Sequence, residues 1–186
     1  MTSTSTVSIT PGSITPGSTT TGSTSTVDTV IGPFTTLVDN DGAVLAAGWT
    51  AQLEDLLPLV APALRPVSVV HRMDLGAVTA AVTAYHRGDL AAICDVPVRQ
   101  RGGEFLEHTW QVLRAIPAGA PVSYTELAAK SGRPRAVRAA AAACARNPAA
   151  LFVPCHRVLR ADGSLGGFRW GLPTKRWLLT HESPPA

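Results

Sequence analysis

The chain has 186 residues, of which 45% are hydrophobic, and its formal net charge is +3. This length suits one or two small domains that bury a core, and the hydrophobic share is typical of a globular protein. The three cysteines, Cys94, Cys144 and Cys155, form an odd set without a Cys-x-x-Cys pair. Their spacing argues against a disulfide framework and against a structural zinc site, and it favours a reducing compartment.

Charge is distributed unevenly along the chain. Residues 28–103 carry 5 Lys or Arg against 8 Asp or Glu, a net of −3, whereas residues 104–182 carry 11 against 5, a net of +6. A basic half beside a mildly acidic half is typical of a protein that meets a polyanion. An uneven but solvated surface would give the same counts, so charge alone leaves both interpretations open.

The first 27 residues are of low complexity. Seventeen of the first 26 are Ser or Thr, and Ile-Thr-Pro-Gly-Ser occurs twice in succession. Such a stretch has too little apolar surface to offset the entropy of ordering it, so we expect residues 1–27 to be disordered. The stretch also lacks the basic start and apolar core of a secretory signal. Residues 183–186 are expected to form a short tail.

Residues 28–103 are expected to form a small α/β domain that begins with a strand hairpin. Residues 34–38 and 43–49 are rich in strand-forming side chains, and the Asp-Asn-Asp-Gly cluster between them is typical of a tight turn. A helix is expected over residues 52–64, perturbed by its two prolines. The domain therefore combines a hairpin with helices.

A second helix of this domain is expected over residues 74–86. Asp74 is a plausible N-cap, and the glycine that follows the helix is a plausible stop signal. Residues 90–103 have the composition of a linker, with a proline and a Gly-Gly pair among basic side chains. The domain boundary is therefore placed there.

Residues 104–116 are expected to form an amphipathic helix, because apolar and aromatic side chains recur at helical spacing. These side chains are Phe105, Thr109, Trp110, Leu113 and Ile116. Trp110 is interpreted as a core residue rather than as a contact to a ligand.

Two short helices joined by a glycine-containing turn are expected next. Ser123 and Glu126 fit a capping box at the start of the first helix, which should end at Gly132. Pro134 suits the first turn of a second helix that continues to Arg146. The pattern predicts a helix-turn-helix, although an ordinary helical hairpin has the same pattern.

The second of these helices is suited to close approach rather than to reading base edges. Residues 139–143 are an unbroken alanine run, with no side chain that could recognise a base. Arg135 and Arg138 lie three residues apart, which places them on one side of a helix. Because small residues with arginines suit contact with a groove and its phosphates, Arg135, Arg138 and Ala139 are candidate DNA contacts. A tightly packed core helix would favour alanine equally.

The strongest candidate for chemistry is the cysteine of the Pro-Cys-His-Arg-Val motif at residues 154–158. It follows an apolar run and precedes a glycine-rich loop at residues 163–171. The thiolate is the nucleophilic form of cysteine, and positive charge or a histidine base beside it raises the thiolate fraction. We therefore expect His156 and Arg157 to favour the thiolate of Cys155. The alternative is a buried, inert cysteine.

These residues together resemble the O6-alkylguanine-DNA alkyltransferases, also called methylated-DNA–protein-cysteine methyltransferases. The resemblance covers about residues 104–182. It rests on Ser123-Tyr124, Arg138 with its alanine-rich helix, Asn147-Pro148, Phe152 to Val158 and Gly163 to Gly171. It implies an α+β fold, in which a small N-terminal α/β domain precedes a mainly helical, winged-helix-like catalytic domain with a helix-turn-helix.

The resemblance implies direct-reversal repair of double-stranded DNA. The alanine-rich helix would enter the minor groove, and Arg138 would fill the gap that an extruded base leaves in the stack. Tyr124 would crowd the 3′ phosphate and donate a hydrogen bond to the purine N3. The alkyl group of O6-alkylguanine, and of O4-alkylthymine, would pass irreversibly to Cys155. The protein would act once, without a metal or an organic cofactor.

The resemblance also implies roles for the other site residues. His156 would deprotonate the Cys155 thiol through a water, Glu182 would orient His156, and Asn147 would brace the turn. Carbonyls of Cys155 and Val158 would accept from the exocyclic amine of guanine, and a loop amide near Arg169 would donate to O6. The base pocket would be formed by Tyr124, Val158, Gly167, Phe168, Arg169 and Trp170.

Other classes of function remain as alternatives. A non-catalytic sensor of alkylated DNA, or a winged-helix DNA-binding protein, would bind without being modified. A cysteine hydrolase with a Cys-His pair would turn over repeatedly on an acyl substrate. We expect a cytoplasmic protein that is a monomer in solution and binds no membrane.

Overall fold

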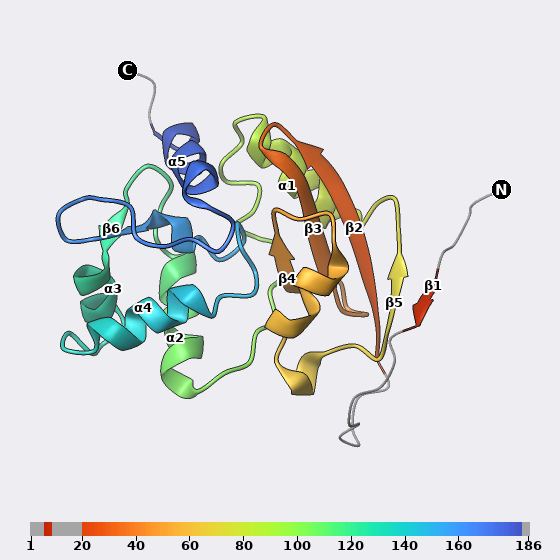
Figure 1. Cartoon of the computed structure of the whole chain (residues 1–186), viewed down its shortest axis with the longest axis horizontal. Helices are drawn as coiled ribbons and strands as arrows, with labels where there is room; N and C mark the ends of the chain where they lie inside the picture. Colours follow the sequence, from red (N-terminus) through yellow and green to blue (C-terminus); the bar gives the residue numbers. More distant parts are fainter. Residues whose placement is uncertain (1–5, 9–19, 184–186) are drawn as a thin grey trace. The chain divides into compact units, whose positions relative to one another are not determined.

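The computed structural model describes residues 6–8 and 20–183, and the chain divides into two compact units, Met1–Arg101 and Gly102–Ala186 (Figure 1). The division falls two residues before the expected start of the catalytic domain at residue 104. As far as its residues are described, the first unit is a sheet with one α-helix and short 3-10 helices, and the second unit is mainly helical. The α+β class expected from the sequence is confirmed.

The first unit is built on a sheet of five strands. In spatial order they are β1 (Thr6–Ser8), β5 (Ser68–His71), β2 (Thr21–Thr29), β3 (Gly32–Val38) and β4 (Val44–Gly48). β2, β3 and β4 run antiparallel in succession, whereas β5 pairs with β2 in parallel. The expected hairpin is confirmed as β3 and β4, with a register shift at Leu37 and Val38.

Strands β1 and β2 contradict the expected disorder of residues 1–27 at the positions that the structure describes, 6–8 and 20–27. Thr21–Thr29 forms the central strand of the sheet, and Thr6–Ser8 pairs with β5; residues 1–5 and 9–19 lie outside the described part of the chain. Threonine is β-branched and favours strands, and its hydroxyl finds partners across the sheet. Thr24 Oγ1 donates to the Thr36 carbonyl at 3.0 Å, and the Thr26 and Thr35 hydroxyls lie 2.8 Å apart. Low complexity here conceals a strand.

Of the two helices expected in this unit, the first does not form as one α-helix and the second is shorter than predicted. The stretch expected as one helix forms three 3-10 helices, Leu53–Asp55, Leu57–Leu59 and Pro62–Leu64, because a proline cannot donate the backbone hydrogen bond of a continuous α-helix. Helix α1 spans Ala77–His86, and its N-cap is Gly76. Asp74 instead accepts hydrogen bonds from the Gly76 amide and the Thr79 hydroxyl, ahead of the helix.

The segment interpreted as a linker is partly fixed to the sheet. The Val44 amide donates to Pro97 O at 2.8 Å, and the Arg99 amide donates to Val44 O at 2.9 Å. The Arg99 guanidinium also pairs with Asp39 at 2.5 Å and with Asp41 at 3.0 Å. Residues up to Arg99 therefore belong to the first unit.

The core of the first unit lies between the sheet and helix α1, which covers one face of the sheet (Figure 1). Phe34 on β3 is fully buried, and its ring meets Trp49 edge-on at 4.8 Å. Val82 and Tyr85 of α1 are also fully buried. Burial of this apolar surface stabilises the unit.

Within residues 102–183, the second unit contains four α-helices and a pair of short parallel strands. They are α2 (Glu104–Arg114), β6 (Val122–Ser123), α3 (Tyr124–Lys130), α4 (Val137–Ala145), β7 (Val158–Leu159) and α5 (Leu172–His181). A 3-10 helix, Cys155–Arg157, precedes β7. The loop between β7 and α5 is drawn in blue in Figure 1.

The amphipathic helix and the helix-turn-helix are confirmed as α2 and the pair α3–α4. Trp110 is a core residue, and its indole nitrogen donates to Ala143 O of α4 at 2.9 Å. Ser123 and Glu126 form the expected capping box. α4, however, begins at Val137, because Arg133–Ala136 closes a separate turn with a bond from the Ala136 amide to Arg133 O. Pro134 and Arg135 therefore precede the helix.

At the end of α5, the Ser183 hydroxyl donates to Leu179 O at 2.8 Å, so the expected tail is fixed at its first residue; residues 184–186 are outside the described part.

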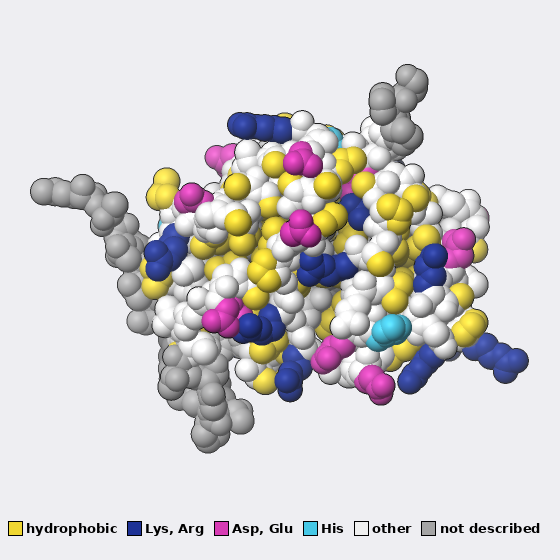
Figure 2. Space-filling model, turned by 180° about the vertical axis from the view of Figure 1, so that it is seen from behind, with side chains coloured by type: hydrophobic (Ala, Val, Ile, Leu, Met, Phe, Trp, Pro, Cys, Tyr) yellow, Lys and Arg dark blue, Asp and Glu magenta, His cyan; other side chains and the backbone are white. Residues whose placement is uncertain are grey.

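On the face drawn in Figure 2, basic and acidic side chains are interspersed. The excess of basic charge is therefore not gathered into one patch on that face.

Candidate active site

The candidate nucleophile, Cys155, lies on a tightly turned segment between α4 and β7. Residues 149–153 are buried, and Leu151 has a φ of 71°, an unusual conformation for a residue with a large side chain. The Val153 amide donates to Ala149 O at 2.9 Å, and the Cys155 amide donates to Val153 O at 2.8 Å. Strain of this kind persists only where surrounding contacts hold it, and it is common at functional sites.

Asn147 holds this segment in place. Its side-chain amide donates to Val153 O at 2.7 Å and to Cys155 Sγ at 3.2 Å, and its Oδ1 accepts from the Ala149 amide at 3.1 Å. Asn147 is buried, with 5% of its surface exposed. One side chain therefore braces the turn at both ends and also contacts the sulfur.

Three charged or ionisable side chains form a buried cluster beside Cys155. His156 Nε2 lies 2.9 Å from Glu182 Oε1. The Arg157 guanidinium donates to both Glu182 oxygens, at 2.7 and 2.8 Å, and to Ile116 O at 2.5 Å. Arg157 therefore holds Glu182 in a bidentate ion pair and joins the cluster to the segment that follows α2.

The electrostatics of this cluster define the form of His156. Burial alone would raise the pKa of Glu182, but its hydrogen bonds and charge contacts with His156 and Arg157 hold that pKa well below the ordinary value. Burial lowers the pKa of His156, against the opposing effect of Glu182. A neutral histidine facing a carboxylate must donate through Nε2, which leaves Nδ1 as the basic nitrogen. Nδ1 is buried and has no hydrogen-bond partner within residues 20–183.

Cys155 itself is a thiol rather than a preformed thiolate, which corrects the expectation drawn from its neighbours in sequence. Burial raises its pKa, although the Asn147 hydrogen bond and the charges of Lys175 and Arg169 oppose the rise. The physical reason is that Arg157 and His156 are directed to Glu182 instead of to the sulfur. The proton must therefore leave during the reaction.

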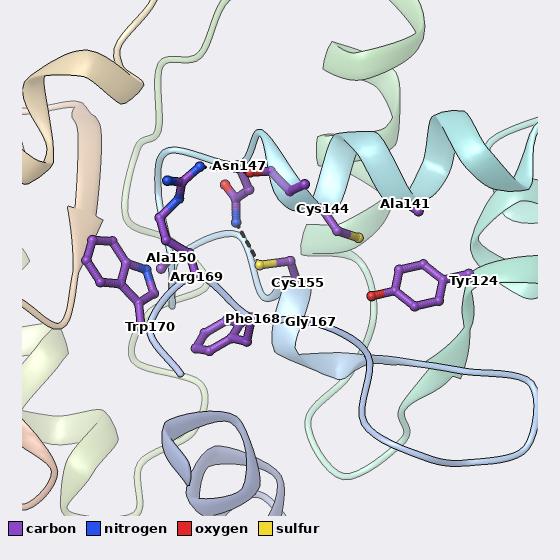
Figure 3. A pocket seen from close by; sticks show the side chains of 11 residues that line it. Tyr124, Ala141, Cys144, Asn147, Ala150, Cys155, Gly167, Phe168, Arg169 and Trp170 are labelled. Atoms are coloured by element: carbon purple, nitrogen blue, oxygen red, sulfur yellow. Dashed lines mark hydrogen bonds between the residues drawn. The ribbon is translucent and has the colours of Figure 1, made fainter. Parts of the chain in front are cut away.

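The sulfur borders a pocket of about 520 Å³, a volume that suits a small organic group such as a nucleobase. Figure 3 shows the side chains around it, with Asn147 bonded to the Cys155 sulfur. The lining comes from α3, α4, the turn and the β7–α5 loop: Tyr124, Ala141, Cys144, Ala145, Asn147, Ala150, Cys155, Gly167, Phe168, Arg169 and Trp170.

Tyr124 stands on the side of the pocket formed by α3, directly after the Ser123 cap. Burial, with smaller effects from Cys144 and Cys155, raises the pKa of its phenol, so the hydroxyl is a neutral donor. The loop packs closely here, because a Cβ added to Gly166 would lie 2.5 Å from Tyr124 Oη. The glycine therefore allows the loop to contact the ring.

The β7–α5 loop supplies the opposite side of the pocket. Arg169 donates to Ala145 O at the end of α4, at 3.0 Å, and so connects the loop to that helix. The Phe168 ring lies edge-on to His156 at 6.5 Å. Gly167 is open, with no atom within 4 Å of an added Cβ.

The candidate DNA contacts lie on the helix-turn-helix. Arg138 is exposed on α4, Ala139 is partly buried beside it, and Arg135 is exposed in the preceding turn. Arg133, the start of the same turn, lies over the Phe105 ring at 5.0 Å.

The predicted catalytic and pocket residues meet in one place, except for Val158, whereas the predicted DNA contacts Arg135, Arg138 and Ala139 do not line the pocket. Tyr124, Asn147, Cys155 and the loop residues line the pocket, whereas His156 and Glu182 are buried behind Cys155. The Val158 side chain is buried outside the lining, and its carbonyl accepts from Lys175.

Three further residues of the site were missed from the sequence. The sequence suggests Arg157 only as a charge near the cysteine and Cys144 only as one of three cysteines, and no motif in it singles out Lys175. The only sequence signal for Lys175 is its place among apolar positions of α5. This signal does not reveal that the side chain is buried, because burial depends on how the chain folds.

Among residues 20–183 and 6–8, no group of three His, Cys, Asp or Glu side chains is arranged to hold a metal ion. Within the same part of the chain, every helix is too short or too polar to cross a membrane.

The second unit matches the family model described as 6-O-methylguanine DNA methyltransferase, DNA binding domain, over residues 104–184. Over 88 residues the chain is 51% identical to the bifunctional transcriptional activator/DNA repair enzyme Ada of Escherichia coli; these residues are 47% of this chain and 25% of Ada. The chain thus spans only a quarter of that relative.

A relative of similar length is the methylated-DNA–protein-cysteine methyltransferase of Salmonella typhimurium, which is 35% identical over 158 residues, or 84% of this chain and 92% of the relative. Among solved structures, the fold is similar to that of Mycobacterium tuberculosis OGT in complex with DNA. That structure has a TM-score of 0.71 and 30% identity, with 86% of this chain and 92% of the other covered.

Proposed function

This chain belongs to the family of methylated-DNA–protein-cysteine methyltransferases, and from this premise we propose that it repairs alkylated double-stranded DNA by accepting the alkyl group on Cys155. One observation carries the proposal. The Cys155 sulfur faces an open pocket, accepts a hydrogen bond from Asn147, and is followed by a neutral histidine locked onto a carboxylate. A nucleophile, a base and a group that orients the base are what transfer to sulfur requires.

The substrate base must first leave the duplex. The O6 substituent of a paired guanine lies inside the helix, so the nucleotide is rotated outward at a cost of a few kcal/mol, which is smaller for a poorly paired, alkylated base. A pocket of about 520 Å³ suits such a base. Arg138 on α4 fills the vacated position in the stack while the alanine-rich face of the helix enters the minor groove.

The base is then held by polar groups around the pocket. The neutral Tyr124 hydroxyl donates to N3 of the purine, a role supported by the raised pKa of its phenol. A backbone amide near Arg169 donates to O6, and the carbonyls of Cys155 and Val158 accept from the exocyclic amine. Donation to N3 and O6 stabilises the negative charge that develops on the purine as it leaves.

The chemical step is a substitution at the alkyl carbon. His156 Nδ1 takes the thiol proton through a water, Cys155 Sγ forms a bond to the carbon, and the O6–carbon bond breaks. The electron pair of that bond stays with guanine, which is restored as the base receives a proton. Glu182 stabilises the imidazolium that forms for a moment, as the lowered pKa of Glu182 supports.

The product is a thioether, which has no hydrolytic route back to the thiol. Each molecule therefore acts once, on O6-alkylguanine or on O4-alkylthymine, as a monomer and without a cofactor. Binding to DNA without a lesion rests on arginines such as Arg135, so its affinity should fall as salt concentration rises.

Mass spectrometry of the protein after incubation with a duplex that contains O6-methylguanine tests the proposal. We expect the peptide that contains Cys155 to gain about 14 Da, because a methyl group replaces the hydrogen of the thiol. Cys155→Ala should gain nothing. Cys144→Ala, which alters the other thiol of the same pocket, should still be methylated.

A wild-type protein that binds the damaged duplex but remains unmodified would overturn the proposal and identify a lesion sensor. Repeated turnover on a thioester or amide would instead identify a hydrolase. Loss of the lesion without a mass gain on Cys155 would exclude the stoichiometric mechanism.

A further inference from the structure

Lys175 is a buried cation that the proposed mechanism does not use. Its side chain has no exposed surface although lysine is usually solvated. Its Nζ donates to Val158 O at 2.6 Å and makes a longer contact of 3.5 Å with Gly166 O. The lysine thus reaches from α5 to the start of β7 and to the β7–α5 loop.

The ammonium of Lys175 is buried without a carboxylate partner. Within residues 20–183, no Asp or Glu oxygen lies within 4.0 Å of its nitrogen, whereas Arg157 in the same unit is paired with Glu182. Burying an unpaired charge is costly, and two carbonyl acceptors offset only part of that cost. A buried charge of this kind is therefore a candidate for a functional role rather than a stabilising one.

The two carbonyls that Lys175 contacts belong to opposite parts of the site. Val158 directly follows the 3-10 helix that carries Cys155, whereas Gly166 lies in the loop that closes the pocket. Gly166 also packs against the Tyr124 ring. One side chain therefore fastens the turn with the nucleophile to the wall of the pocket.

The groups around this ammonium include both thiols of the pocket. Burial raises the pKa of Cys155, and the Asn147 hydrogen bond and the charge of Lys175 oppose that rise; burial lowers the pKa of Lys175. The ionisable side chains near Lys175 or Cys155 are Cys144 on α4, Tyr124 on α3, His156 beside the nucleophile, Arg160 after β7 and Arg169 in the loop. In the proposed reaction it is Cys155 that becomes negatively charged, and a cation such as Lys175 stabilises that charge.

We propose that Lys175 is a positioning residue for alkyl transfer, whose buried charge, held by the Val158 and Gly166 carbonyls, supports the negative charge on the Cys155 sulfur as its proton leaves. This inference rests on the proposed function, because it assigns Lys175 to the same nucleophile. It differs from a purely structural role in requiring the charge as well as the hydrogen bonds.

Three substitutions separate the charge from the hydrogen bonds. Lys175→Arg keeps the charge, Lys175→Gln keeps a donor without charge, and Lys175→Met removes both. Arg176→Met, at the next and exposed position of α5, is the matched control. The readout is the rate at which iodoacetamide modifies Cys155 without DNA, measured by peptide mass spectrometry across pH 6 to 10.

We expect Cys155 in Lys175→Met and Lys175→Gln to react about tenfold more slowly than in wild type near neutral pH. The reason is that loss of one nearby positive charge raises the pKa of a thiol by about one unit. Their rate profiles should move to higher pH. Lys175→Arg should recover most of the wild-type rate, and Arg176→Met should match wild type. The same order should appear in the rate of methyl transfer from O6-methylguanine DNA.

A wild-type profile in Lys175→Gln would overturn the inference, because it would show that the charge is dispensable. Equal losses in Lys175→Arg and Lys175→Gln would do the same. If Lys175→Met does not fold, as judged by the absence of a cooperative unfolding transition, the comparison of Lys175→Arg with Lys175→Gln still tests whether the charge is required. The iodoacetamide assay needs no lesion, so failure of the proposed function is recognised separately, by an unmodified wild-type protein in the DNA assay.

Discussion

The two units bury different kinds of polar side chain. In the first unit, the buried polar residues among those described are hydroxyl-bearing, Thr24, Ser25, Thr35 and Thr36, and all lie on the paired strands β2 and β3. In the second unit, they include His156, Arg157, Lys175 and Glu182. Hydroxyls are inexpensive to bury once bonded, whereas buried charges are costly.

The difference shows where the chain has accepted a cost in stability. Arg99 of the first unit pairs with Asp41, which is exposed, and with Asp39, whose side chain is 10% exposed; the Arg99 side chain itself is 47% exposed, so water reaches this cluster. Among the described residues, the charged side chains with at most 3% of their surface exposed are Arg157, Lys175 and Glu182, and they lie around Cys155, where perturbed ionisation is typical of a functional site. The first unit is therefore read as a scaffold, and the second as the part that performs chemistry.

The largest expected effect comes from removing the charge that balances this cluster. Glu182→Gln leaves Arg157 buried without its carboxylate, so we expect the second unit to lose about 3–5 kcal/mol of unfolding free energy. Chemical denaturation followed by tryptophan fluorescence measures the loss. Asp41→Asn, which breaks an exposed pair in the first unit, is the control and should change little. Similar losses in both variants would remove the contrast between the units.

The next largest effect is expected from lowering the pH, which should destabilise the second unit through His156. Burial lowers the pKa of His156 in the folded state from 6.5, so the unfolded state binds more protons below that pH and stability falls as pH decreases. The slope should approach about 1.4 kcal/mol per pH unit for one proton. Denaturation of wild type and His156→Gln between pH 7 and 5 tests this, and the variant should lose the slope. A slope that persists in the variant would assign it to other groups.

A smaller effect is expected from crowding Tyr124. Gly166→Ala would place a Cβ 2.5 Å from Tyr124 Oη, whereas Gly167→Ala meets no atom within 4 Å. Neither glycine has a positive φ, so backbone strain does not separate the two variants. We expect Gly166→Ala to slow methyl transfer by about threefold to tenfold, as the ring is displaced. Single-turnover kinetics should show Gly167→Ala, whose added methyl group enters the pocket without touching the protein, slowed less than Gly166→Ala; equal rates in both would contradict the packing argument.

The smallest effect should come from a hydroxyl of the first unit. Thr24→Val removes the bond to Thr36 O but keeps the shape and the strand preference of the side chain. A loss of about 0.5–1.5 kcal/mol is expected in denaturant unfolding. A loss as large as that of Glu182→Gln would mean that buried hydroxyls matter to this protein as much as buried charges.

Local signals in the sequence were read correctly where neighbours along the chain decide the structure. The capping box of Ser123 and Glu126, the helix around Trp110 and the β3–β4 hairpin all formed as predicted. Signals failed where distant partners decide. Disorder was predicted for the threonines of β2 because the threonine tract alone does not show where their hydroxyls find hydrogen-bond partners. Those partners lie on β3.

The sequence by itself determined the family, the candidate nucleophile and the helix-turn-helix, because a rare motif and short-range capping patterns are properties of neighbouring residues. Only the tertiary structure decided the ionisation of the site. It directed Arg157 and His156 to Glu182 rather than to Cys155, and it buried Lys175 between two carbonyls. Ionisation depends on burial and on charges within a few ångströms, and these distances exist only once α5 has packed against the turn that carries Cys155.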